Sequence, residues 1–304
     1  MTQPEWGLLI VVYLFLGGLS AGALVISGLA NYLGRQEHYT ELARVGALVA
    51  PFPVLLGTLF LVFDLGRPPM FWKLFLAFEP ESPMWVGTWL LTLFSIVSLA
   101  YADLFLPQRL RLWKPSSPQL WKNALAAAGL PIGVGVGIYT GVLLGAVPAR
   151  PFWNTPMVAQ LFLFSALSTA AALMMILVPR FSTAAEAEED RKLLVSADIL
   201  FILLELFIIV PYIIHAELST LSARQSLNLI LGGPYTGMFW LGVIVLGLLT
   251  PLATEVLELA PTLARRTAFR PHRLIEVAAG ILVLLGGFLL RYVFVYAGQL
   301  SEFI

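Results

Sequence analysis

Eight long runs of apolar residues, separated by short polar connections, account for most of the sequence. About 20 apolar residues in a helix cross the hydrocarbon core of a bilayer, and each run reaches that length. We therefore predict membrane-spanning helices at residues 7–33, 44–64, 84–106, 121–147, 156–179, 193–215, 235–257 and 273–297. No connection is long enough for a soluble domain. The pattern predicts an all-α integral membrane protein that forms one polytopic domain, residues 1–304.

Similar segments occur in the two halves of the sequence. "GGLSAGAL" (17–24) resembles "SALSTAAAL" (165–173), and "PMWVGTWLL" (83–91) resembles "GMFWLGVIV" (237–245). A four-helix unit used twice keeps its orientation in the membrane, which would make residues 1–150 and 151–304 a parallel repeat. Helix faces rich in small residues also match by chance. We expect two four-helix bundles, whether or not the halves are a repeat.

Composition agrees with this pattern and narrows the chemistry. The chain has 59% hydrophobic and 12% charged residues and a mean hydropathy of +0.87, which exclude an ordinary soluble domain. A net charge of zero argues against nucleic acid as a partner. With no cysteine, the chain offers no disulfide and no thiolate for an iron–sulfur cluster. The first basic residue is Arg35, so we expect the first apolar run to be a retained helix rather than a cleaved signal.

The basic residues predict the orientation of the helices. Thirteen lie in or beside the connections 1–2, 3–4, 5–6 and 7–8, and four lie on the other side. The thirteen are Arg35, Arg44, Arg109, Arg111, Lys114, Lys122, Arg180, Arg191, Lys192, Arg265, Arg266, Arg270 and Arg273. The four are Arg67, Lys73, Arg150 and Arg224. Because cytoplasmic loops carry the excess of Lys and Arg, both termini are predicted to be extracytoplasmic.

Six polar side chains lie inside the predicted spans or at their ends. They are Tyr13, Asp64, Tyr139, Asp198, Glu205 and Arg291. At roughly 1.5 Å per helical residue, all except Asp198 fall in the outer half of the membrane. Ionisable groups in spans are costly and usually face the bundle interior with a partner. A structural ion pair between Arg291 and Glu205 would explain two of the six, whereas the whole set favours a site that binds a polar ligand and exchanges protons.

Asp198 and Glu205 lie in one apolar run, "ADILFILLELFII" (197–209). Seven residues almost complete two helical turns, so the two acids share a face at a separation of about 10 Å. That distance is too long for a direct hydrogen bond but suits water or a hydroxyl between them. We interpret the two acids as stations of a proton path.

Two outer connections are rich in Pro, Trp and Phe. They are "RPPMFWKLFLAFEPESPMWVG" (67–87) and "PARPFWNTP" (148–156). Aromatic residues at a membrane boundary are common, so an aromatic belt is one explanation. "KLFLAF" is also short enough to be a helix that lies in the interface. Such a surface would receive a partner protein or guide a lipid-like ligand inward.

The chemistry left open is that of an organic redox carrier. A buried site of Tyr, Asp, Glu and Arg can hydrogen-bond a quinone carbonyl and handle its protons. The only histidines are His38, His215 and His272, and none shares a depth and face with another inside the bundle, so we exclude bis-histidine haem. Electrons would then have to pass to a docked subunit on the same side as the carrier.

The sequence resembles the NrfD/PsrC-like membrane subunits of polysulfide reductase and related molybdopterin enzymes almost from end to end. The segments that carry the resemblance are "YLFLGGLSAGA" (13–23), "DLGRP" (64–68), "SPMWVGTW" (82–89), "GIYTGVLL" (137–144), "PFWN" (151–154) and "LLRYVFVYAGQ" (289–299). The resemblance implies an eight-helix, haem-free anchor that binds menaquinone or menaquinol. It also implies an extracytoplasmic iron–sulfur ferredoxin-like subunit and a molybdopterin catalytic subunit as partners, with a dimer of such complexes as a further expectation.

Residue by residue, the functional set implied by the resemblance coincides with the six polar positions chosen by depth. Glu205, Asp198 and Arg291 are the candidate catalytic residues, and no metal ligand is predicted. Tyr139, Tyr13 and Asp64, again with Arg291, are the candidate quinone-binding residues. The alternative function is a proton- or ion-coupled secondary transporter, although transporters usually have broken helices at their sites. A scaffold without a ligand is the third possibility, and the buried charges argue against it.

Overall fold

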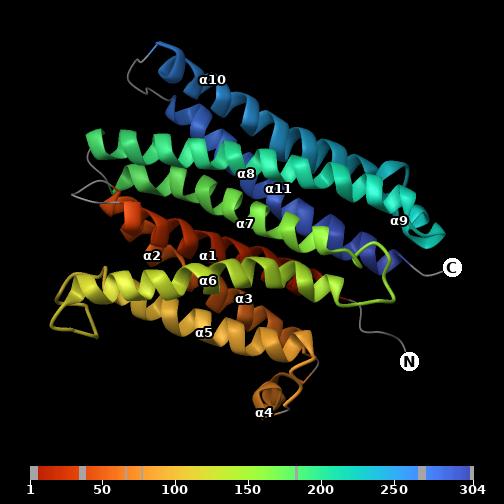
Figure 1. Ribbon diagram of the computed structural model, residues 1–304, viewed down its shortest axis with the longest axis horizontal. Coiled ribbons are helices and arrows are strands. Elements are labelled where there is room, and N and C mark those ends of the chain that lie inside the picture. Colours follow the sequence, from red (N-terminus) through yellow and green to blue (C-terminus); the bar gives the residue numbers. More distant parts are fainter. Residues whose placement is uncertain are drawn as a thin grey trace.

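The computed structural model describes residues 6–33, 39–65, 67–76, 78–181, 184–265 and 272–301. Within these ranges every regular element is a helix, and eight helical segments are long and apolar enough to cross a membrane (Figure 1). The predicted fold class, an all-α protein with eight membrane-spanning helices, is confirmed at this level.

The spans agree with the predicted runs to within a few residues at most ends. In chain order they are α1 (Leu8–Leu33), α2 (Thr40–Val49) with α3 (Pro51–Asp64), α5 (Pro83–Asp103), α6 (Pro118–Gly145), α7 (Pro156–Leu177) with η2 (Val178–Arg180), α8 (Ala184–Leu218), the π-helix η3 (Met238–Leu249) with α10 (Thr250–Arg265), and α11 (Arg273–Leu300). Proline occupies the first turn of α3, α5, α6 and α7, where its missing N–H leaves no hydrogen bond unmade.

Three shorter helices lie outside the spans. The turn η1 (Pro68–Met70) and α4 (Lys73–Leu76) fall in the aromatic connection between the second and third spans, so the helix expected in "KLFLAF" is present in part. The helix α9 (Leu221–Leu231) follows α8 and was not predicted. The side chain of Thr220 caps its first turn by accepting a hydrogen bond from the Ala223 N–H at 3.2 Å.

The helices α1 and α7 form the centre of the molecule. In the most apolar stretch of each, 78% and 72% of the residues are buried, more than in any other span of the described residues. The helix α1 packs against α3, α6 and α7, and α7 packs against α6, α8 and α11. Figure 1 shows α3, α5 and α6 on one side of this pair and α8, α10 and α11 on the other. One continuous hydrophobic core therefore joins the two halves.

The start of α1 and the end of α11 meet at one end of the molecule. The Trp6 N–H donates to Gln299 Oε1 at 2.7 Å, and Gln299 Nε2 donates to the Trp6 carbonyl at 2.9 Å. From the α6–α7 connection, Arg150 donates to the Ser301 carbonyl at 2.7 Å and Trp153 Nε1 donates to the Phe294 carbonyl at 2.6 Å. We call these contacts the outer clasp, because this end is predicted to be extracytoplasmic.

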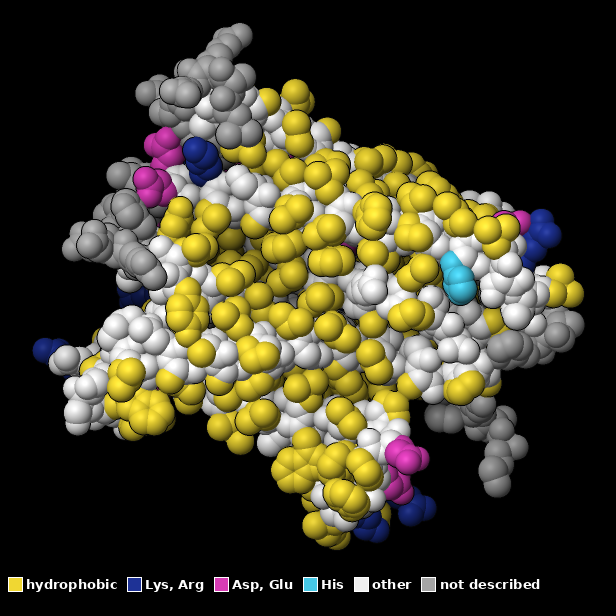
Figure 2. Space-filling model, in the orientation of Figure 1, with side chains coloured by type: hydrophobic (Ala, Val, Ile, Leu, Met, Phe, Trp, Pro, Cys, Tyr) yellow, Lys and Arg dark blue, Asp and Glu magenta, His cyan; other side chains and the backbone are white. Residues whose placement is uncertain are grey.

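The sidedness of the molecule itself stays a prediction from the basic residues, and of these Arg35, Arg266 and Arg270 lie outside the described residues, as does His38. Figure 2 shows hydrophobic side chains over the face between the two ends, with Lys, Arg, Asp and Glu near the ends. This distribution is typical of a protein surrounded by lipid.

The close contact of α1 with α7 generates the first prediction. A Cβ on Gly22 would overlap the carbonyl oxygen of Ala166 and the Cβ of Ala170. Gly22→Ala should therefore force the helices apart and cost about 1–3 kcal/mol of stability, the usual effect of overpacking. Thermal unfolding in detergent measures this loss. Gly237→Ala is the control, because no atom lies within 4 Å of its new methyl group; equal melting temperatures for the two variants would contradict the packing argument.

Candidate functional site

The six predicted polar residues form two groups on different faces of α1 rather than one cluster. Tyr13 and Tyr139 are neighbours between α1 and α6. Arg291, Glu205 and Asp198 are neighbours among α7, α8 and α11. The cost of a polar group in lipid predicts that such residues face the bundle interior, and five of the six are buried, but this cost does not say which neighbouring helix each one meets.

The first group surrounds the phenol ring of Tyr139. This ring packs against Gly87 of α5 so closely that a Cβ at position 87 would overlap the ring and its hydroxyl. Tyr13 is fully buried beside it, and its hydroxyl has no hydrogen-bond partner among the described residues. Asp64, at the end of α3, is half-buried near the start of α1, where its carboxylate faces Gly7.

A cavity of about 430 Å³ adjoins Tyr139. Its walls come from α3, α5, α6 and the aromatic segment around α4, and they include Leu59, Phe71, Phe75, Thr88, Ile96 and Tyr139. They are largely apolar, and several of their side chains, among them Leu59 and Ile96, are about half exposed on the lipid-facing surface (49% and 61%). The cavity thus opens toward lipid, and its volume lies in the range of small-ligand sites.

The polar groups of this cavity are unequal in what they offer a ligand. The hydroxyls of Thr58, Thr88, Thr92 and Ser95 each donate to a carbonyl one turn back in their own helix. The Tyr139 hydroxyl makes no such bond among the described residues. It is therefore the polar group in this wall with free capacity to donate to, or accept from, a ligand.

The second group is centred on the Arg291 guanidinium, which is completely buried in α11. Its Nη1 donates to Ser165 Oγ at 2.7 Å and to the Gly287 carbonyl at 2.8 Å, and its Nη2 donates to the Phe162 carbonyl at 3.3 Å. The ring of Phe162 lies 5.2 Å from the guanidinium carbon. Arg291 is not part of the wall of the cavity beside Tyr139.

Glu205 is the acid that acts electrostatically on this arginine. It is 2% exposed, it attracts Arg291 electrostatically, and it lies near the Ser165 hydroxyl. The Ser165 hydroxyl accepts from the arginine and lies near the carboxylate, and within the described residues these two charged groups form no direct ion pair at 4.0 Å or less. A carboxylate without a direct ion pair is freer to exchange a proton than one held by a bidentate ion pair.

Asp198 lies further along α8 beside a carboxyl group that the sequence reasoning missed. Its side chain is fully buried near Ser168 of α7 and Glu255 of α10, and among the described residues the side-chain oxygens of all three have no hydrogen-bond partner. Glu255 is 3% exposed. It falls inside the predicted span 235–257, so an acid within an apolar run was the signal that could have identified it.

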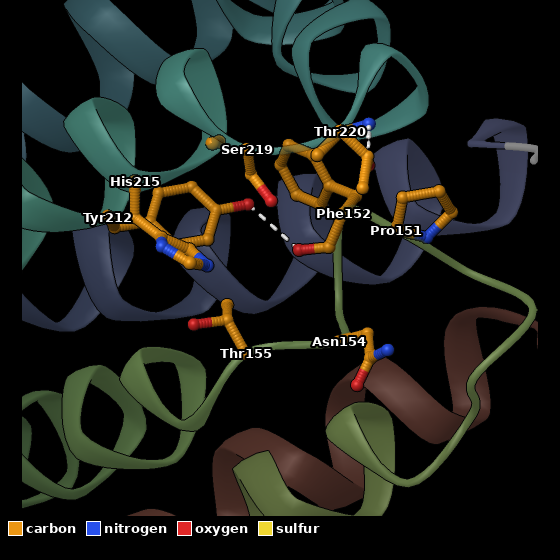
Figure 3. A pocket seen from close by; sticks show the side chains of 10 residues that line it. Pro151, Phe152, Asn154, Thr155, Tyr212, His215, Ser219 and Thr220 are labelled. Carbon is orange, nitrogen blue, oxygen red and sulfur yellow. Dashed lines mark hydrogen bonds between the residues drawn. The ribbon is translucent and has the colours of Figure 1, made fainter.

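A second, smaller pocket of about 110 Å³ lies at the outer end, between the α6–α7 connection and the end of α8 (Figure 3). Tyr212 donates from its hydroxyl to the Phe152 carbonyl at 2.9 Å in its wall, and His215 and Thr155 also line it. Its size suits a few water molecules rather than a ring system. Over the part of the sequence that the structure describes, no three His, Asp or Glu side chains converge as metal ligands.

Comparison with known proteins gives a consistent result. A family profile described as "Polysulphide reductase, NrfD" matches residues 2–301. The chain belongs to this family. It is similar to protein NrfD of Escherichia coli (strain K12), with 32% identity over 97% of this chain and 95% of the relative. It is also similar to a polysulfide reductase chain of Wolinella succinogenes, with 31% identity over 97% of this chain and 94% of the relative. A selenate reductase subunit of Mesobacillus selenatarsenatis is 28% identical over 97% of this chain and 74% of the relative.

Membership of the NrfD family confirms the resemblance seen in the sequence motifs. Together with the eight apolar helices, it makes the chain a multi-pass protein of the bacterial cytoplasmic membrane.

The hydrogen bond from Arg291 to Ser165 generates the second prediction. Ser165→Ala removes the hydroxyl that accepts from Arg291 Nη1 and leaves the buried guanidinium with one hydrogen bond fewer. We expect a loss of about 1–3 kcal/mol of stability, seen as a lower unfolding temperature in detergent. Ser196→Ala is the control, because this exposed hydroxyl of α8 donates to the Lys192 carbonyl of its own helix. A Ser165→Ala variant as stable as Ser196→Ala would contradict the role of Ser165 in holding Arg291.

Proposed function

We propose that this chain is the quinone-binding membrane anchor of a respiratory reductase complex. In this role it oxidises menaquinol near the outer surface and passes the electrons to an extracytoplasmic iron–sulfur subunit, which serves a molybdopterin reductase of the polysulfide reductase type. Membership of the NrfD family supports the general role, since relatives bear the names of polysulfide reductase and selenate reductase. The chemistry of the cavity beside Tyr139 supports the ligand.

The observation that carries the proposal is an apolar cavity, open to lipid, with one unused hydroxyl in its wall. A quinone has a flat apolar ring with two carbonyls and an isoprenoid tail, so it needs a lipid entrance, apolar walls and few polar contacts. The residues present meet each need: Leu59 and Ile96 lie at the open side, Phe71 and Phe75 offer ring surfaces, and Tyr139 offers the hydrogen bond. Menaquinol supplies two electrons and two protons when it is oxidised there.

Tyr139 forms the hydrogen bond to the ligand carbonyl, and Tyr13 lies behind Tyr139 as seen from the ligand. The Tyr13 hydroxyl is buried and unpaired among the described residues, so it is a candidate to receive a proton or hydrogen bond relayed through Tyr139. Asp64, at the outer end of α3, lies where a proton released at the site would reach the outside. In this arrangement Tyr13 and Asp64 flank the ligand rather than bind it directly.

The partner subunit would dock at the outer end, where the aromatic connections lie. No cysteine is available for a cluster in this sequence, so electrons must leave to a cofactor held by the partner. A cavity in the outer half keeps that transfer short. The outer clasp and the segment around α4 provide the surface on the same end of the molecule.

We assign proton transfer, rather than binding of the quinone ring, to Arg291, Glu205 and Asp198. We propose that Glu205 and Asp198 are successive stations of a proton path along α8 and that Arg291, through Ser165, holds Glu205 in place. The helix α8 runs unbroken through both acids. Ion-coupled transporters usually interrupt a helix at their site, so this continuity favours the redox function over the transporter.

Tyr139→Phe provides the first functional prediction. Removing the hydroxyl should weaken binding of a quinone analogue by about tenfold, the value of one hydrogen bond of about 1.5 kcal/mol. Gly87→Ala should weaken it similarly without changing a polar group, because the new methyl group displaces the Tyr139 ring. Gly135→Ala on the same helix as Tyr139 is the matched control, since its methyl group meets only ordinary contacts with Leu90. Analogue binding by titration calorimetry measures all three, and unchanged binding in both test variants would place the quinone elsewhere.

Arg291→Gln provides the second functional prediction. The substitution removes the positive charge that stabilises the ionised form of Glu205. We therefore expect quinol-dependent turnover to fall by at least about a hundredfold, as for loss of an acid–base group. Analogue binding should stay within about twofold of wild type because Arg291 does not line the cavity. Arg224→Gln is the control, because this exposed arginine pairs with Glu217 at the outer surface. Turnover near wild type in an inserted Arg291→Gln variant would show that the buried arginine has no part in the reaction.

A further inference from the structure

We propose that the predicted cytoplasmic end of the molecule carries a binding site for the head group of an anionic phospholipid, centred on Lys122. The phosphate of the lipid lies among Lys122, Arg111 and Arg44, and its acyl chains lie along exposed apolar residues beside these cations. The site does not depend on the proposed quinone reaction.

The connection between α5 and α6, residues 104–117, combines positive charge with apolar side chains. Its middle reads "RLRLWK" (109–114), and Lys122 follows near the start of α6. The sequence contains no Asp or Glu between Asp103 and Glu186. Figure 1 shows this connection at the end of the molecule opposite to the two termini. The positive charge of the segment is therefore not balanced by acids along the chain.

Hydrogen bonds of Asp103 and Arg111 hold the connection in place. Asp103, at the end of α5 and buried, accepts hydrogen bonds from the N–H groups of Leu112 at 2.8 Å and Trp113 at 2.9 Å. Arg111 Nη2 donates to two carbonyls of the connection, at 2.9 and 3.1 Å. Among the described residues no salt bridge joins Asp103 to a cation. The carboxylate at the start of the connection thus orders the backbone and leaves the cations without a direct partner.

Three cations gather beside this connection. The Lys122 ammonium lies 4.0 Å from the centre of the Phe105 ring, and the positive charges that act on it are those of Arg111 and Arg44. Arg44, on α2, also contacts Glu41 of its own helix at 3.4 Å. In the described part of the chain no acid pairs with Lys122 or Arg111. Like charges at one place repel each other, so an anion bound among them stabilises the group.

The position of Lys122 distinguishes a binding site from the general excess of positive charge at this end. A lysine that only favours the orientation of a helix lies in water, as the exposed Lys114 does. Lys122 is instead half-buried, with arginines as its charged neighbours. Its ammonium makes no hydrogen bond within the described residues, so its three N–H groups are available to a phosphate.

The apolar residues around the cations favour a lipid over a free anion. Leu110, Leu112 and Leu120 are exposed, and Leu112 reaches 94%. Exposed leucines next to cations are typical of a segment that lies in the membrane interface. The rings of Trp113 and Trp121 pack edge to face with their centres 4.7 Å apart, and tryptophan is enriched at the depth of lipid head groups. Cations at that depth on the cytoplasmic side attract anionic lipids.

Lipid titration of the purified, delipidated full-length protein tests the site. Native mass spectrometry should show dioleoyl phosphatidylglycerol bound to wild type more tightly than dioleoyl phosphatidylcholine, which has the same acyl chains and no net charge. Lys122→Gln should weaken binding of phosphatidylglycerol by about tenfold, as for loss of one charge-assisted hydrogen bond. Lys122→Arg keeps the charge and should keep the binding. Lys114→Gln is the matched control, because it removes the same charge from an exposed position of the same connection.

Thermal unfolding separates binding from a structural role of Lys122. In neutral detergent without lipid, Lys122→Gln should melt no lower than wild type, because the substitution relieves repulsion among the cations. Added phosphatidylglycerol should raise the melting temperature of wild type and Lys114→Gln, and that of Lys122→Gln by less than half as much. Inorganic phosphate at the same concentration should have no effect.

Four results would overturn the proposal. Two concern affinity: equal binding of the two lipids to wild type, or equal weakening by Lys122→Gln and Lys114→Gln, which would indicate attraction by net charge alone. Two concern melting: a Lys122→Gln variant that melts lower than wild type without lipid, which would make the lysine structural, or stabilisation by inorganic phosphate equal to that by phosphatidylglycerol, which would make the ligand a free anion.

Discussion

The close approach of α1 to α7 is the constraint on which the rest of the structure depends. Lipid tails are as apolar as leucine, so membrane helices associate through close packing rather than through exclusion from water. Here Gly18 and Gly22 of α1 lie directly against Ala166 and Ala170 of α7, where side chains of ordinary size would not fit. The same seam brings the Arg291 guanidinium against Gly18, at 3.1 Å from the position that a Cβ would occupy. The close packing of α1 against α7 therefore also sets the position of the buried charge.

This arrangement places the two groups of polar residues on two faces of one helix, α1. On one face of α1, Tyr13 meets Tyr139 beside a cavity that opens to lipid. On the other face, Arg291 is held by Ser165 and by backbone carbonyls, with Glu205 beyond. The apolar cavity and the buried charge are thus kept apart, which avoids placing apolar walls next to an ion that needs polar neighbours.

Much of the fold followed from the sequence, because length and apolarity alone identify a membrane span. The site was predictable only in part. Asp198, Glu205 and Arg291 were conspicuous as charged residues in apolar runs, and all three are buried. Glu255 was overlooked because it stands near the inner end of its span, where an acid needs no special explanation until its neighbours are known. The separation of the six residues into two groups depends on the azimuth of each helix, and no periodicity in a single sequence specifies that angle.

The outer clasp has a consequence for how the molecule is made. Trp6 and Gln299 are separated by 293 positions, so their hydrogen bonds form only after the last helix has entered the membrane. Until then the α6–α7 connection also lacks the Phe294 and Ser301 carbonyls that hold Trp153 and Arg150. The surface at this end, predicted to be extracytoplasmic, consequently takes its final shape at the last step of biogenesis. A soluble protein that recognises this surface would distinguish a fully inserted molecule from a truncated one, and assembly would begin only on finished molecules.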